Sequence, residues 1–161
     1  MKTLQLNTLK VAAGLLMALC CISFSGCVYE VPITATPTRK VETKLLGDWV
    51  SKDGQNKLKV RKLDDSVYIL SVNGQLFRAY HSDVAKTPFA SVQEIESPER
   101  KYTYVIWSVS EDGKRLNWRA LSSKVIPQSI KDPAAVQKLL EKNLKNAELF
   151  DDEQEYTKEK P

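Results

Sequence analysis

The sequence has few of the residues that build metal sites and disulfides. Its 161 residues include one histidine, His81, and three cysteines. Two of them, Cys20 and Cys21, lie in an apolar stretch near the start, and Cys27 follows shortly after it. Zinc sites of the usual kinds need several histidine and cysteine ligands. If the leader that holds Cys20 and Cys21 is removed, only His81 and Cys27 remain, and such a site cannot be assembled. We expect His81 to lie at the surface or at a strand edge.

The sequence also lacks the motifs of common catalytic and nucleotide-binding sites. It contains no phosphate-binding glycine loop and no calcium loop with its glycine and acidic spacing. Ser82 and Asp83 follow His81, but adjacent residues of a strand point to opposite faces and cannot form a triad. We predict no catalytic residue, no metal and no bound cofactor, and we expect that the protein is not an enzyme.

Charge of one sign is not concentrated along the chain. There are 24 Lys and Arg against 20 Asp and Glu, a formal net charge of +4. Two of the positive charges, Lys2 and Lys10, lie at the start of the chain and would be lost with a cleaved leader. This balance does not support a basic nucleic-acid surface, and we expect no nucleic-acid partner.

The first 26 residues have the pattern of a signal peptide. After Lys2 and Lys10 comes an apolar stretch from Val11 to Ile22. As a helix, about a dozen residues span roughly 18 Å, whereas the hydrocarbon core of a bilayer is roughly 30 Å thick. The segment is therefore too short for a permanent transmembrane helix, and we predict that residues 1–26 are removed.

The residues that follow carry a resemblance to a known class. Phe24, Ser25, Gly26 and Cys27 resemble the lipobox of bacterial lipoproteins, which has small residues before an invariant cysteine. The resemblance implies cleavage between Gly26 and Cys27, with a diacylglyceryl group on the Cys27 thiol and an acyl chain on its amino group. The membrane is then a partner. Val28, where an aspartate would favour inner-membrane retention, favours the outer membrane if the organism has two. The alternative is ordinary secretion with a free Cys27 thiol.

Residues 27–43 have no sustained hydrophobic period. They contain Pro32, Pro37 and four threonines, which predicts a lipidated, flexible tether that holds the domain away from the membrane. Because Cys27 is the only cysteine after the predicted cleavage, no internal disulfide is possible. The domain at 44–150 must be held by its hydrophobic core.

The pattern of that domain is one of short strands joined by turns. Leu58 and Val60 alternate with charged residues, which is typical of a half-buried strand. Asn73-Gly74 and similar dipeptides mark tight turns. We predict a mainly β fold, a small antiparallel meander curled into a barrel-like sheet. The expected strands span 46–52, 57–62, 66–72, 75–82, 88–94, 101–110 and 114–121.

The spacing of the apolar residues changes after the last of these strands, from that of a strand to that of a helix. Asp132 is a suitable N-cap and Pro133 a suitable first helical residue. We therefore predict one C-terminal amphipathic helix packed on the sheet, with an apolar face formed by Val136, Leu139, Leu140, Leu144 and Ala147. The remaining residues, 151–161, are mostly charged, and we expect a fraying tail.

Two further resemblances involve the domain. Gly47 and Trp49, at the first expected strand, resemble the G-x-W motif of lipocalins, in which the tryptophan closes the barrel bottom near an arginine of the last strand. Arg119 or Arg115 would be that arginine. The segments FRAYHSDVAKTPFASVQ and YTYVIWSVSEDGKRLNWRAL look like a group of uncharacterised exported bacterial lipoproteins. That group implies no activity.

Aromatic residues are the remaining candidates for function. They either fill the core or form a binding surface, and in a small domain without disulfides the core is the simpler interpretation. We expect a non-enzymatic binding module for a small apolar ligand or an envelope partner. The alternative is an inhibitor, or an assembly or structural factor, acting on another envelope protein. The candidate surface residues are Tyr80, Tyr102, Tyr104, Trp107 and Trp118.

Overall fold

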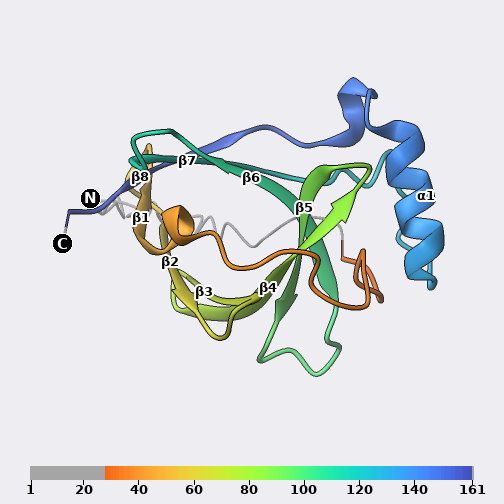
Figure 1. Cartoon of the computed structure of the whole chain (residues 1–161), viewed down its shortest axis with the longest axis horizontal. Coiled ribbons are helices and arrows are strands. Elements are labelled where there is room, and N and C mark those ends of the chain that lie inside the picture. The colour runs from red at the N-terminus through yellow and green to blue at the C-terminus, as the bar shows by residue number, and fades with distance from the viewer. Residues whose placement is uncertain (1–27, 161) are drawn as a thin grey trace, which may run out of the picture.

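Eight antiparallel strands form a closed barrel in the computed structural model, which describes residues 28–160 (Figure 1). Each strand pairs with the next along the chain, and the last pairs with the first. The predicted β-meander is thus confirmed, and its seven expected strands match β1 to β7 within a few residues. The strands are β1 (Gly47–Ser51), β2 (Lys57–Lys62), β3 (Val67–Val72), β4 (Gln75–Val84), β5 (Thr87–Glu94), β6 (Tyr102–Val109), β7 (Arg115–Ala120) and β8 (Gln154–Lys158).

The eighth strand corrects the prediction of a fraying tail. Strand β8 pairs with β7, where Leu116 is opposite Tyr156, and with β1, where Trp49 is opposite Lys158. Tyr156 is buried in the barrel core. The expectation failed because QEYTK is short and mostly polar, and only its neighbours on both sides stabilise it as a strand.

The interior of the barrel forms the first hydrophobic core. Residues that face inward alternate with outward residues along each strand, as the period of two requires. On β2, for example, Leu58 and Val60 are buried, whereas Lys57 and Lys59 are exposed. The core also contains Trp49, Tyr68, Leu70, Phe77, Val92, Val105, Leu116 and Tyr156.

A second core lies outside the barrel, on the outer face of β4, β5 and β6. The helix α1 (Pro133–Asn143) covers part of this face with Val136 and Leu140. The Asp132 side chain caps the helix by accepting hydrogen bonds from Ala134 and Ala135. The predicted helix is confirmed, but it ends at Asn143, so the expected Ala147 lies exposed in a later 3-10 turn. The helix also precedes β8 in the chain rather than ending the fold. Two 3-10 turns flank the barrel, η1 (Thr43–Leu45) and η2 (Ala147–Leu149).

The segment at residues 28–41 covers another part of this outer face, which corrects the prediction of a flexible tether. Tyr29 and Ile33 are fully buried in the second core. The Tyr29 backbone exchanges two hydrogen bonds of 2.7 Å with Tyr102. Proline did not prevent docking, because side chains of β4 and β5, such as Tyr80 and Ser91, form hydrogen bonds with the backbone of this segment. We call residues 28–41 the N-terminal strap.

The predicted signal peptide and the lipidation site at Cys27 lie outside the described residues. Among residues 28–160, no helix has the length and apolar character needed to cross a membrane.

Candidate functional site

The two ends of the barrel differ, and one of them carries a groove. The β3–β4 turn and the β5–β6 loop meet at the end that we call the mouth. A groove of about 250 Å³ lies there. Phe77, Val92 and Val28 supply its apolar part, and Glu94, Glu99 and Lys101 are its charged residues. Gln75, Ser97 and Thr103 complete the lining.

Polar contacts fix the rim of this groove. Gln75 donates a hydrogen bond of 2.5 Å to Glu94, and Lys101 forms an ion pair of 2.5 Å with Glu99. This ion pair lowers the pKa of Glu99 and raises that of Lys101, so both groups are charged near neutral pH. The groove therefore combines an apolar surface with both signs of charge.

The barrel interior behind the mouth is almost filled. Its remaining void measures about 30 Å³ and is lined by aliphatic side chains with Trp107, Trp118 and Tyr156. Roughly 30 Å³ is the share of liquid volume of one water molecule, whereas small-molecule sites usually exceed roughly 300 Å³. The interior thus has no room for an organic ligand.

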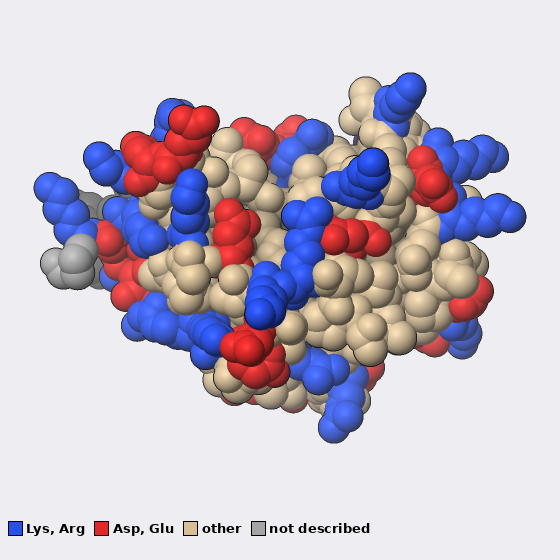
Figure 2. Space-filling model, viewed as in Figure 1, with Lys and Arg blue, Asp and Glu red and all other residues tan. Residues whose placement is uncertain are grey.

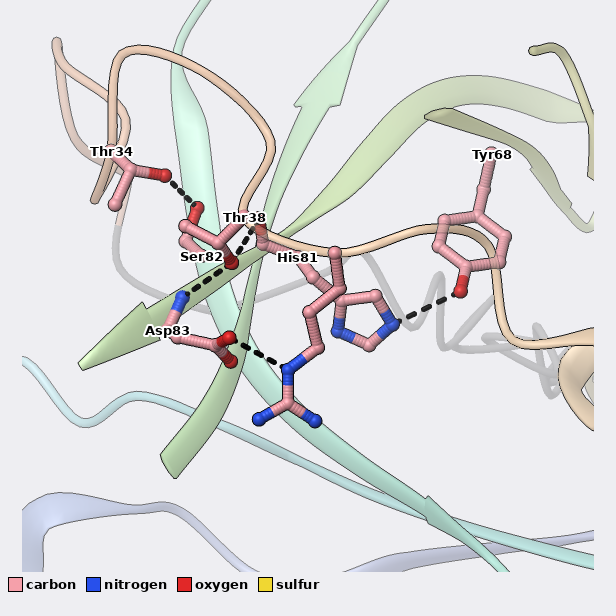
Figure 3. A network of polar contacts seen from close by, with 7 residues as sticks. Thr34, Thr38, Tyr68, His81, Ser82 and Asp83 are labelled. Carbon is pink, nitrogen blue, oxygen red and sulfur yellow. Dashed lines mark hydrogen bonds and ion pairs between the residues drawn. The ribbon is translucent and has the colours of Figure 1, made fainter. Parts of the chain in front are cut away.

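A buried polar network occupies the barrel beside this void (Figure 3). His81 is 3% exposed, which corrects the expectation of a surface histidine. Tyr68 accepts a hydrogen bond of 2.6 Å from the Glu42 backbone, and its hydroxyl lies 3.0 Å from His81 Nε2. The Tyr68 proton needs an acceptor, which makes Nε2 the acceptor and places the His81 proton on Nδ1.

Burial and the charges nearby determine the protonation of His81. Burial lowers its pKa most, and the nearby Arg39 lowers it further, while Glu42, Asp83 and the Phe89 carbonyl raise it. Arg39 forms an ion pair of 2.7 Å with Asp83. Burial also raises the pKa of Tyr68 to about 12. His81 and Tyr68 are therefore both neutral at pH 7.

Three buried polar atoms of this region have no hydrogen-bond partner within the described chain. They are His81 Nδ1, Trp107 Nε1 and Asp83 Oδ1. The ring centroids of His81 and Trp107 are 5.5 Å apart. Such atoms are uncommon in folded proteins and cost stability unless water or a ligand bonds to them. Trp107 also lines the interior void, and with Tyr68 it belongs to the barrel core, so the network is part of that core.

Ser82 does not join His81 in a catalytic arrangement. Its hydroxyl bonds to Thr34 at 2.7 Å and to Ser91 at 3.0 Å on the outer face of β4. His81 faces the interior, as the strand alternation predicted. Within residues 28–160, no group of three or more His, Cys, Asp or Glu is placed to hold a metal ion.

The five predicted aromatic residues do not form one surface. Trp107 and Trp118 are paired across β6 and β7 and line the void. Tyr80, Tyr102 and Tyr104 lie on the outer face, where the strap covers them, and all three are buried. Their expected role as an exposed binding surface is therefore wrong.

The three tyrosines hold the strap instead. The Tyr104 hydroxyl donates to Val31 O at 2.5 Å, and the Tyr80 hydroxyl donates to Thr34 O at 2.8 Å. The sequence alone could not assign this role, because a buried and a binding tyrosine share the same strand pattern.

The Gly47 to Trp49 motif closes the barrel end opposite the mouth. Trp49 is buried, and its indole N–H donates to Leu45 O at 2.9 Å. The cation over its ring is Lys158 of β8, not an arginine of β7 as expected. Arg119 instead bonds to the carbonyl of Asp151 and covers the ring of Phe150.

The sequence pattern missed the mouth groove and the role of Lys158. Tyr156 is the single apolar residue of QEYTK, so no hydrophobic alternation indicated β8. No signal in the sequence marked the groove, because it joins Val28 to residues of β4, β5 and β6.

Comparison with protein families, curated proteins and solved structures found no match.

Proposed function

We propose that this protein is a membrane-anchored envelope lipoprotein whose barrel is a non-enzymatic binding module with its ligand site at the mouth. The observation that carries the proposal is the groove of about 250 Å³, next to an interior that is nearly full. Its size is close to the lower end of the usual range for small-molecule sites. Its apolar part and its charged rim suit an amphipathic ligand with an apolar chain.

The anchor in this proposal is the lipid on Cys27, which becomes the first residue after cleavage between Gly26 and Cys27. The lipobox-like residues Phe24 to Cys27 support it. Val28 in place of an aspartate supports an outer-membrane location in an organism with two membranes. Two or more acyl chains on one residue hold a protein firmly on a bilayer.

The lipocalin resemblance of the G-x-W motif also supports a binding role. The barrel has eight antiparallel strands, a short turn before Gly47, and a cation of the last strand over Trp49. Two features depart from the lipocalin pattern. The helix α1 lies between β7 and β8, and the interior has no deep cup.

A fluorescent fatty acid such as parinaric acid tests the proposal by titration. We expect saturable binding to the wild-type protein, and an affinity at least about tenfold lower in Thr103→Trp, since the indole fills the groove. Ser108→Trp, on the outer face of the same strand, is the matched control and should bind normally. No saturable binding, together with no adduct in native mass spectra of protein from its own host, would refute the proposal.

The mixed charge of the rim favours a second candidate, an inhibitor or assembly factor that binds a segment of another envelope protein. Crosslinking from position 97, in the groove lining, would then recover a protein partner and not a lipid. Figure 2 shows Lys and Arg intermixed with Asp and Glu on the face it displays.

A further inference from the structure

Exposed apolar side chains gather at the mouth of the barrel. Within the described residues, the large hydrophobic side chains that are exposed number four: Val28 (41%), Leu76 (37%), Ile95 (48%) and Leu63 (59%). The first three are at the mouth, because Val28 lines the groove and the Ile95 N–H bonds to Leu76 O at 3.0 Å. Only Leu63, in the β2–β3 turn, lies at the opposite end.

The strap begins at this same end. Tyr29 is fully buried, its ring stacks on Tyr104 with the centroids 4.1 Å apart, and its backbone pairs with Tyr102. Two Cα steps of about 3.8 Å join Tyr29 to residue 27, so covalent geometry alone keeps their Cα atoms within about 8 Å. A lipid on Cys27 would therefore be attached directly beside the mouth, with no length of free chain.

We infer that the mouth rests on the surface of a phospholipid bilayer, with Val28, Leu76 and Ile95 in contact with the lipid. This inference rests on the lipid anchor of the proposed function. A bilayer is the expected occupant of this surface because the chain runs from Val28 at the mouth directly to Cys27, the proposed site of the lipid anchor. The barrel is held in one orientation, and a ligand reaches the groove from the bilayer.

The charges of the mouth identify the kind of bilayer surface. The β5–β6 loop carries Glu96, Glu99, Arg100 and Lys101, whose charges balance, and Glu94 at the end of β5 adds one negative charge to the mouth. A balanced loop suits zwitterionic headgroups and does not depend on anionic lipid. Contact is therefore expected on phosphatidylcholine or phosphatidylethanolamine vesicles, and it should vary little with salt because it depends on apolar side chains.

Environment-sensitive probes on the lipidated, full-length mature protein test the orientation. Ile95→Cys and Leu63→Cys each add one free thiol for labelling, and both replace an exposed aliphatic side chain in a loop between strands. In phosphatidylcholine vesicles we expect the probe at position 95 to shift to shorter wavelength and to be quenched severalfold more by nitroxide-labelled lipid. The probe at position 63 should behave as in water. Equal quenching at both positions would overturn the inference.

A linker insertion tests the role of the short connection. About twelve Gly and Ser residues between Val28 and Tyr29 have a root-mean-square length of roughly 19 Å, enough to free the barrel from a fixed orientation. We expect quenching at position 95 to fall toward that at position 63. Unchanged quenching would overturn the argument from the strap.

Mass spectrometry of the purified protein separates this inference from the anchor. If Cys27 carries no lipid, the anchor of the proposed function fails. If Cys27 is lipidated and both probes remain in water, the anchor stands and the orientation is wrong.

Discussion

Lys158 lies over the indole ring of Trp49, with its ammonium nitrogen 4.9 Å from the ring centroid. The same nitrogen donates a hydrogen bond of 3.2 Å to Lys44 O in the turn before β1. Trp49 and Lys158 are direct partners in the β1–β8 register. This pair therefore joins the first and last strands and covers the closed end of the barrel.

Replacing Lys158 should weaken this closure. We expect Lys158→Ala to lower the free energy of unfolding by about 1 kcal/mol, because a cation over an indole contributes roughly 0.5–1 kcal/mol at exposed sites and the bond to Lys44 O is also lost. Lys158→Arg should retain most of the stability. Urea unfolding measures both, with Lys160→Ala as the control. A Lys158→Ala protein as stable as wild type would show that the contact is not stabilising.

Gly47 and Lys158 should be energetically coupled. Gly47 has φ +143°, and a Cβ atom there would come within 2.6 Å of Lys158 Cε. Gly47→Ala should destabilise the fold by about 1–3 kcal/mol through backbone strain and this clash. In Gly47→Ala/Lys158→Ala the clash disappears, so the double variant should lose less than the two single losses added together. Additive losses in urea unfolding would contradict the coupling.

Truncation tests the strand that closes the barrel. Ending the chain after Asp152 removes β8 and with it the buried Tyr156, which leaves β1 and β7 with unpaired edges. We expect this protein to be unfolded or aggregated, as judged by circular dichroism and gel filtration. Ending the chain after Glu159 keeps β8 and the bond from Glu159 N to Asp48 O, and should leave the fold intact. A folded, monomeric product of the shorter truncation would contradict the role of β8.

Tyr29 should be essential to the docking of the strap. Because its ring is fully buried, we expect Tyr29→Ala to cost about 3–5 kcal/mol. Tyr29→Phe keeps the stack on Tyr104 and loses the hydroxyl contact with Ile126 O at 3.3 Å, so it should cost about 1 kcal/mol. Thermal unfolding compares the two. If the strap is a free tether, both changes will be neutral.

The buried His81 should make stability depend on pH. Its pKa is lowered in the folded state from the ordinary value of 6.5, mainly by burial, so the unfolded chain binds the proton more readily. The free energy of unfolding should therefore be constant above pH 6.5 and fall below it, by at most about 1.4 kcal/mol per pH unit. Urea unfolding between pH 5.5 and 7.5 measures this, and His81→Gln should remove the slope. An equal slope in that variant would assign the effect to other groups.

The local pattern of the sequence predicted most of the fold. Alternation on β2 and β7, the Asn73-Gly74 turn and the Asp132-Pro133 helix start all depend on residues a few positions apart. Such features follow from backbone geometry and capping, which act locally. Seven strands and the helix could therefore be expected without knowledge of the partners.

Only the tertiary structure decided the features that depend on distant partners. The polar β8 is a strand because β1 and β7 both offer edges to it, and the strap is ordered because it covers aromatic side chains of β4 and β6. His81 is buried because Tyr68 and Trp107 surround it. The sequence by itself determined the alternation, the turns and the helix, since these depend on neighbouring residues. Barrel closure, the docked strap and the mouth groove depend on contacts between residues far apart in the chain, which no local pattern contains.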